Sequence, residues 1–137
     1  MLMAGLLLAL LGSAEPGAGQ TAPAAPTAPR AVIVQQMQAF ADNDLAAAFA
    51  LASPRLQQLF QTPQRFGQMV QGGYPMVWRH QGLRFLGARR QGPLHFEKLI
   101  IADLQGRMHL LEYQLEYTEN GWRIAAVRFL DAAPPSV

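Results

Sequence analysis

The spacing of apolar residues changes at Gly72-Gly73, and this change constrains the fold more than any other feature of the sequence. Before this point, apolar side chains recur every three or four residues, which is the period of an amphipathic helix. From Tyr74 onward they alternate with polar side chains, which is the period of a strand. Helices followed by consecutive strands predict an α+β fold in which the helices pack on an antiparallel sheet.

Four helices are predicted in the first half of the domain. The first carries Ile33, Met37 and Phe40 along one stripe. Short capping segments separate these four helices: each segment ends one helix and offers a side-chain cap for the next. They are Asp42-Asn43-Asp44, Ser53-Pro54 and Thr62-Pro63. Gly72-Gly73 then closes the last helix, because glycine readily adopts the positive φ found at helix ends.

Four strands are predicted after the helices, within residues 77–89, 94–103, 107–117 and 122–130. The last two connections contain the turn sequences Gln105-Gly106 and Asn120-Gly121. Asn-Gly between alternating apolar runs is the strongest short-range signal for a hairpin. We therefore expect the strands to form an antiparallel four-stranded meander.

The first residues have the pattern of a secretory signal peptide. Met1 to Leu11 is an apolar run without a preceding Lys or Arg, and Gly12-Ser13-Ala14 follows it. The run is shorter than the roughly 20 residues that span a bilayer, and small residues after an apolar core are typical of a cleavage site. We expect cleavage after Ala14 and a periplasmic or secreted protein with no membrane anchor. The alternative is a buried N-terminal helix.

Residues 15–29 are dominated by Ala, Pro, Gly and Thr and have no apolar period, so we expect a flexible linker. A single domain is expected over residues 30–131, with a disordered tail at 132–137. The chain has no cysteine, which excludes disulfides and an acylated anchor. Its net charge of +2, with 15% charged residues, is too small for a nucleic-acid-binding surface.

Several segments resemble a family of short bacterial exported proteins, the domain of unknown function 4864. The segments are Ala39-Phe40 with Asp42, Ala52-Ser53-Pro54, Phe60, Thr62-Pro63, Phe66, Gly73-Tyr74-Pro75, Tyr113, Leu115 and Gly121-Trp122-Arg123-Ile124. The resemblance covers residues 30–130. It implies a remote member of the nuclear transport factor 2-like and SnoaL-like superfamily, whose cone-shaped fold packs N-terminal helices on a curved meander. The family name implies no activity, and no catalytic residue can be transferred to this sequence.

Strand pairing gives a candidate ligand site. If both turns contain an even number of residues, one face of the sheet brings together Lys98, Tyr113 and Arg128. This face is the more aromatic one, so we expect it under the helices. Two cations and a phenol among apolar neighbours suit a small anion such as a carboxylate. The alternative is that both cations reach solvent at the rim of the sheet, and a one-residue bulge would turn either of them outward.

Other candidate residues are fewer. Tyr74 and Trp78 stand where the helices give way to the sheet. In the fold that the resemblance implies, residues at this position often border the mouth of the pocket, so we expect both there. The three histidines have no metal-ligand spacing, so neither a metal nor another cofactor is expected. We assign no catalytic residue, because the acids are explained by helix capping or by a solvent-facing strand position. The acids considered were Asp42, Asp44 and Glu97.

The opposite face of the sheet is also partly apolar. Its apolar residues are Leu99, Ile101, Leu110, Val127 and Phe129. A sheet that is apolar on both sides needs a second cover, which predicts a homodimer through the outer sheet face. The alternative is a set of scattered exposed apolar residues, which any protein surface carries.

The sequence thus favours an exported, non-catalytic domain that binds a small ligand or a protein partner in the envelope. The alternative is an isomerase-like or cyclase-like enzyme that uses the cone pocket. A third hypothesis is a structural partner in an envelope assembly, tethered through the linker.

Overall fold

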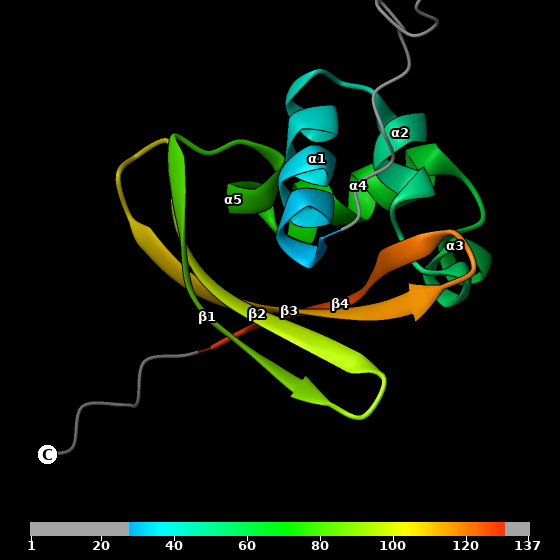
Figure 1. The fold of residues 1–137 in the computed structure, drawn as a ribbon. Coiled ribbons are helices and arrows are strands. Elements are labelled where there is room, and N and C mark those ends of the chain that lie inside the picture. The colour runs from blue at the N-terminus through cyan, green and yellow to red at the C-terminus, as the bar shows by residue number, and fades with distance from the viewer. Residues whose placement is uncertain (1–27, 131–137) are drawn as a thin grey trace, which may run out of the picture.

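The computed structural model describes residues 28–130 as five helices followed by four strands (Figure 1). The helices are α1 (Pro29–Ala41), α2 (Leu45–Ala50), α3 (Pro54–Phe60), α4 (Pro63–Gly73) and α5 (Pro75–Trp78). The strands are β1 (Gly82–Gln91), β2 (Leu94–Ala102), β3 (Met108–Thr118) and β4 (Gly121–Phe129). The predicted α+β class and the order of helices before strands are confirmed.

Helices α2, α3 and α4 begin at the predicted capping residues. The side chains of Asp44, Ser53 and Thr62 each accept a hydrogen bond from the backbone N–H three residues ahead, at 3.0 to 3.3 Å. Each bond satisfies one of the N–H groups that a helix leaves unpaired at its start. Pro54 and Pro63 occupy the first turns of α3 and α4, where the missing proline N–H is not needed.

The segment before the first strand differs from the prediction. Residues Pro75–Trp78 form the short helix α5, and β1 begins only at Gly82. Pro75 fixes a helical φ at the first turn, and the Tyr74 carbonyl accepts hydrogen bonds from the N–H groups of Val77 and Trp78. These local contacts favour a helical turn over the early part of the strand predicted at 77–89.

The four strands form one antiparallel sheet in the order β1-β2-β3-β4. Figure 1 shows the sheet curving around the helices, which all lie on its concave side. The core lies between these two layers. Its largest fully buried side chains include Phe40 and Ile33 of α1 and, from the sheet, Leu99, Leu111 and Tyr113.

The β2–β3 register differs by one residue from the prediction. Lys98 pairs with Glu112 and Leu99 with Leu111, because the connecting loop over residues 103–107 has an odd number of residues. Asp103 closes this loop: its backbone N–H donates to the Arg107 carbonyl at 2.9 Å, and its carboxylate accepts two N–H groups of the loop. A one-residue shift moves every side chain of a strand to the other face. The prediction that Lys98 lies under the helices is therefore wrong.

A β-bulge changes the outer half of β4. Leu115 pairs with Ile124 and Gln114 with Ala126, which leaves Ala125 as the extra residue. Before the bulge, Trp122 and Ile124 face the helices as expected. Beyond it the side chains reverse, so Arg128 faces outward beside Glu112 and its predicted place under the helices is wrong.

The two register changes also correct the predicted outer face. Four of its expected apolar residues face the helices or the cavity described below: Leu99, Ile101, Val127 and Phe129. Only Leu110 of that set points outward. Glu97, expected in solvent, is 2% exposed and bonds to Arg30 at 2.8 Å on the helix side. The homodimer through the outer sheet face stays a prediction. Most of the apolar residues on which it was based do not lie on that face.

The predicted signal peptide, nearly all of the linker and the tail lie outside the described residues. Within residues 28–130, no helix is both long and apolar enough to cross a membrane.

Candidate functional site

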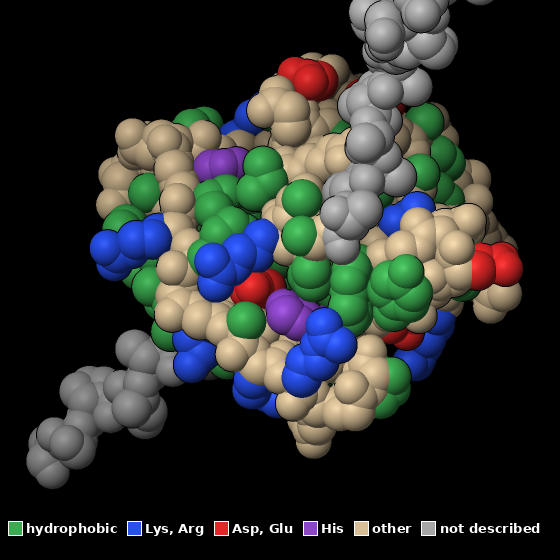
Figure 2. Space-filling view, viewed as in Figure 1, with side chains coloured by type: hydrophobic (Ala, Val, Ile, Leu, Met, Phe, Trp, Pro, Cys, Tyr) green, Lys and Arg blue, Asp and Glu red, His purple; other side chains and the backbone are tan. Residues whose placement is uncertain are grey.

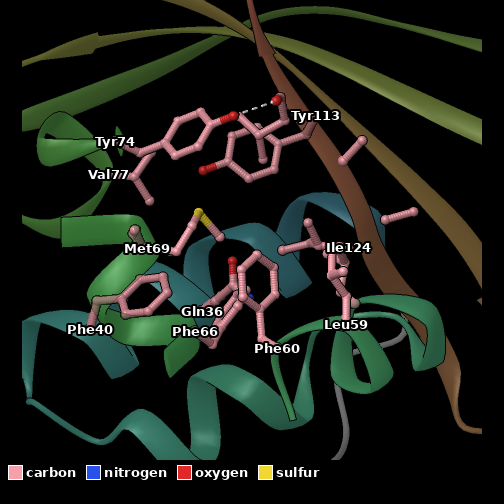
Figure 3. A pocket seen from close by; sticks show the side chains of 15 residues that line it. Gln36, Phe40, Leu59, Phe60, Phe66, Met69, Tyr74, Val77, Tyr113 and Ile124 are labelled. Carbon is pink, nitrogen blue, oxygen red and sulfur yellow. Dashed lines mark hydrogen bonds between the residues drawn. The ribbon is translucent and has the colours of Figure 1, made fainter. Parts of the chain in front are cut away.

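A cavity of about 280 Å³ lies between the helices and the inner face of the sheet (Figure 3). Its walls come from α1, α3, α4, α5, β3 and β4. The lining side chains are Gln36, Phe40, Leu56, Leu59, Phe60, Phe66, Met69, Val70, Tyr74, Val77, Tyr113, Ile124, Ala125, Ala126 and Val127. None of these described residues carries a charge. A concave site with an apolar lining and few polar groups is the usual form of a small-molecule pocket.

Two local features keep this space open. Every side chain of α3 remains at least partly exposed, and Leu59 lines the cavity although it is 66% exposed. Opposite α3, β4 lines the cavity at its bulge with Ala125 and Ala126, neither of which has a side chain large enough to fill the space. A short, loosely packed helix facing two alanines fills less volume than the rest of the core.

Aromatic rings form the floor of the cavity. The ring of Phe66 lies 5.4 to 5.9 Å, centroid to centroid, from the rings of Phe40, Phe49 and Phe60. These separations fall in the range where aromatic pairs are favourable beyond their buried area. The cluster joins α1, α2, α3 and α4, so it holds the helical wall of the cavity together.

Tyr113 supplies the main polar group of the cavity. Its side chain is 0% exposed, and its hydroxyl makes no hydrogen bond within the part of the chain that the structure describes. Burial, with a smaller contribution from Tyr74, raises the pKa of Tyr113 far above its usual value, so the hydroxyl stays protonated and able to donate. Figure 3 shows this hydroxyl pointing toward Tyr74 and Val77, with Met69 between it and the centre of the cavity.

Two more polar side chains border the same space. The Tyr74 hydroxyl donates to the Val127 carbonyl at 3.0 Å, and its ring stacks on Phe129 at 5.2 Å. The Gln36 amide nitrogen donates to the Ala48 carbonyl at 3.0 Å, which leaves its amide oxygen facing the cavity (Figure 3). Tyr74 therefore serves as a fixed wall, whereas Tyr113 and Gln36 retain unused hydrogen-bonding capacity.

Of the five residues predicted to bind a ligand, the structure brings Tyr74 and Tyr113 together in this cavity. Trp78 lies outside it, with its ring 5.6 Å from Phe40. Lys98 and Arg128 lie on the opposite face of the sheet. Whether any of the five binds a ligand stays a prediction. Gln36 was missed, although a polar residue inside the Ile33–Phe40 apolar stripe was a visible signal.

Metal ligands do not gather in the described region. Within residues 28–130, no three His, Asp or Glu side chains lie close enough together to hold an ion. The cavity chemistry rests on apolar contact, one free hydroxyl donor and one amide acceptor. It suits a neutral, largely apolar molecule that carries a hydrogen-bond acceptor.

Helices on the concave face of a curved four-stranded meander, with a cavity between the layers, define a cone-shaped α+β fold. The sequence profile of the domain of unknown function DUF4864 matches residues 24–137, and the chain belongs to that family. A comparison with curated proteins found no match.

Solved structures resemble this chain at low sequence identity. A SEC-C motif-containing protein from Rhodopseudomonas palustris is 17% identical, with a TM-score of 0.57 over 75% of this chain and 79% of that one. An NTF-2-like protein of unknown function from Shewanella oneidensis is 13% identical, with a TM-score of 0.48 over 74% and 95%. Another from Burkholderia xenovorans is 17% identical, with a TM-score of 0.44 over 77% and 87%.

Proposed function

We propose that the protein is an exported binding protein whose cavity takes a neutral, largely apolar small molecule with a hydrogen-bond acceptor such as a carbonyl. The observation that supports this most is the Tyr113 hydroxyl, which is fully buried, protonated and unpartnered among residues 28–130. A buried hydroxyl without a partner costs about 1–3 kcal/mol. A ligand acceptor would recover part of that free energy, which is a source of affinity specific to this site.

The lining argues for a neutral ligand rather than the anion that the sequence favoured. That expectation depended on Lys98 and Arg128, and both point away from the cavity. The described lining contains no acid either, so we base the proposal on binding and not on the isomerase-like or cyclase-like alternative. Export is part of the proposal and rests on the pattern of Met1 to Ala14.

Entry to Tyr113 requires a side-chain movement. Met69 stands between the hydroxyl and the cavity centre, and methionine is unbranched and flexible enough to move aside (Figure 3). α3 forms the outer wall without burying any of its side chains completely. A ligand can therefore enter between α3 and the β4 bulge and displace Met69.

Prodan tests this proposal, since it is a neutral, apolar naphthalene dye with a carbonyl group whose emission shifts to the blue in apolar surroundings. We expect the protein to bind prodan with a blue shift. Tyr113→Phe should weaken binding about fivefold, the equivalent of one neutral hydrogen bond. Tyr117→Phe is the matched control, because Tyr117 is 68% exposed and lies outside the cavity lining.

Two further variants separate cavity binding from surface binding. Ala125→Leu adds volume to the lining and should reduce prodan binding, whereas Met69→Ala clears the path to Tyr113 and should strengthen it. Circular dichroism checks that each variant is folded. Equal binding by the wild type, Ala125→Leu and Tyr113→Phe would overturn the proposal.

A further inference from the structure

The outer face of the sheet, which no described helix covers, carries a row of charged residues across all four strands. Gly87 of β1 pairs with Lys98 of β2, Lys98 with Glu112 of β3, and Glu112 with Arg128 of β4. Arg89 and Arg84 lie on the same face of β1. Figure 2 shows basic side chains along the lower side of the molecule, where the sheet lies in Figure 1.

Glu112 lies at the centre of this row, and two arginines donate hydrogen bonds to one of its carboxylate oxygens. It is 5% exposed, and its Oε1 accepts hydrogen bonds from Arg128 Nε at 3.0 Å and Nη2 at 2.6 Å and from Arg89 Nη2 at 3.2 Å. Burial alone would raise the pKa of Glu112, but the hydrogen bonds from Arg128 and Arg89 outweigh it and hold the pKa below its usual value. Glu112 therefore stays ionised and neutralises one of the neighbouring cations.

Lys98 is a cation of this row that has no bonding partner among the described residues. It stands directly opposite Glu112, yet its ammonium makes neither a hydrogen bond nor an ion pair with any residue from 28 to 130. The three cations Arg89, Lys98 and Arg128 surround one carboxylate, so the row keeps an excess of positive charge. An exposed ammonium beside two guanidinium groups attracts anions from solution.

A shallow hollow of about 200 Å³ adjoins Lys98. It is lined by Leu86, Gly87, Ala88, Arg89, Phe96, Lys98 and Glu112. A side chain added at Gly87 would meet nothing within 4 Å, so this wall of the hollow is open. The Arg89 guanidinium lies 3.9 Å above the Phe96 ring, which holds it in place beside the hollow.

We propose that this hollow binds a carboxylate side chain of an acidic segment in a protein partner. The carboxylate would lie between the Lys98 ammonium and the Arg89 guanidinium, with further acidic residues near Arg84 and Arg128. Basic residues on β1, β2 and β4, next to the exposed Leu86, suit an extended protein surface better than a single small anion. A second copy fits less well, because a two-fold contact through this face would bring two basic rows together.

The probe is a fluorescein-labelled oligoglutamate peptide, compared with the same peptide in which Gln replaces each Glu. We expect the glutamate peptide to bind in low salt and more weakly at about 0.15 M salt, while the glutamine peptide does not bind. Lys98→Gln should lower the affinity about fivefold. Arg55→Gln is the matched control, since it removes one exposed positive charge from α3 on the helical side.

Three results would contradict the proposed peptide site, and each points to a different explanation. Equal weakening by Lys98→Gln and Arg55→Gln would mean attraction to overall charge, and the proposed site would be wrong. Binding to vesicles of phosphatidylglycerol and phosphatidylcholine that depends on Lys98, without peptide binding, would assign the row to a membrane surface. A dimer in analytical ultracentrifugation that Lys98→Gln disrupts would assign it to a second copy. Unchanged prodan binding by Lys98→Gln confirms an intact fold and keeps this test separate from that of the cavity.

Discussion

The Tyr74 hydroxyl donates a hydrogen bond to the Val127 carbonyl at 3.0 Å, joining the end of α4 to β4 immediately beyond its bulge. These residues are 53 positions apart in the sequence. The contact fixes one wall of the cavity. Because Tyr74 bonds to the Val127 carbonyl, that carbonyl is not the partner of the Tyr113 hydroxyl on the neighbouring strand. The same bulge turns Arg128 to the outer face, so one irregularity in β4 shapes both candidate sites.

Tyr74→Phe should lower the free energy of unfolding by about 1 kcal/mol, because one hydrogen bond is lost while the ring and its stacking on Phe129 remain. Urea unfolding followed by fluorescence measures the change. Tyr117→Phe, at an exposed position, should leave the unfolding midpoint unchanged. If both variants unfold at the wild-type midpoint, the Tyr74–Val127 bond contributes nothing to stability.

Two glycines of α4 should respond differently to alanine. Gly72→Ala should stabilise the protein by about 0.5 kcal/mol, because an added Cβ meets nothing within 4 Å and alanine favours the helix. Gly67→Ala should remove this gain or destabilise by about 1 kcal/mol, because its Cβ would lie 2.8 Å from Leu45 Cδ2. Thermal unfolding of the two variants compares them directly. A larger gain for Gly67→Ala would contradict the packing of α2 on α4.

Asp103→Asn should destabilise the protein at neutral pH and lose this effect in acid. The hydrogen bond with His109, at 2.8 Å, lowers the pKa of Asp103 most, and the N–H groups of Arg107 and Gln105 lower it further against the opposing effect of burial. The folded-state pKa therefore lies below the ordinary value of 3.8. A carboxylate with a lowered pKa stabilises the fold above its unfolded pKa and loses that contribution as the pH falls through its folded pKa.

Melting temperatures of the wild type and Asp103→Asn from pH 7 to pH 3 measure this difference. The gap should be constant above about pH 5 and shrink below pH 4. Asp42→Asn is a suitable control at an exposed acid near the end of α1. A gap that widens in acid would show that Asp103 does not stabilise the β2–β3 loop as a carboxylate.

Cleavage after Ala14 is expected when the full chain is expressed in a Gram-negative host. Protein from the periplasmic fraction should begin at Glu15 by N-terminal sequencing and intact mass. Ala14→Glu should block processing, because the cleavage site requires a small residue. An intact N-terminus at Met1 in the cytoplasmic fraction would contradict export.

The sequence predicted the helical half of the fold well because its signals are local. Asp44, Ser53 and Thr62 act on N–H groups three residues away, and the stripe through Ile33, Met37 and Phe40 describes the buried side of one helix. The order of helices and strands also followed from a local signal, the spacing of apolar residues along the chain. Pro75, which starts α5, was a local signal that the prediction did not use.

The candidate site was only partly predictable. The structure places Tyr74 and Tyr113 in the cavity lining, and their positions at the helix–sheet junction and on the inner strand face were the local signals for this. Ligand binding by either residue stays a prediction. Gln36 and Met69 belong to the cavity but sit in helical stripes that also describe an ordinary core. The sheet faces predicted for Lys98 and Arg128 were wrong, because the face of a strand residue depends on strand register, which composition does not reveal.

By itself, the sequence determined the α+β class, the family and the positions of the helix caps, since each depends on residues close together in the chain. The tertiary structure decided which face of the sheet each strand residue occupies. Asp103 closes a loop with an odd number of residues, and Ala125 is an extra residue in β4, so each moves a cation from the core side to the outer side. Side chains alternate along a strand with a period of two, so a single residue in a loop or a bulge is enough to reverse a face.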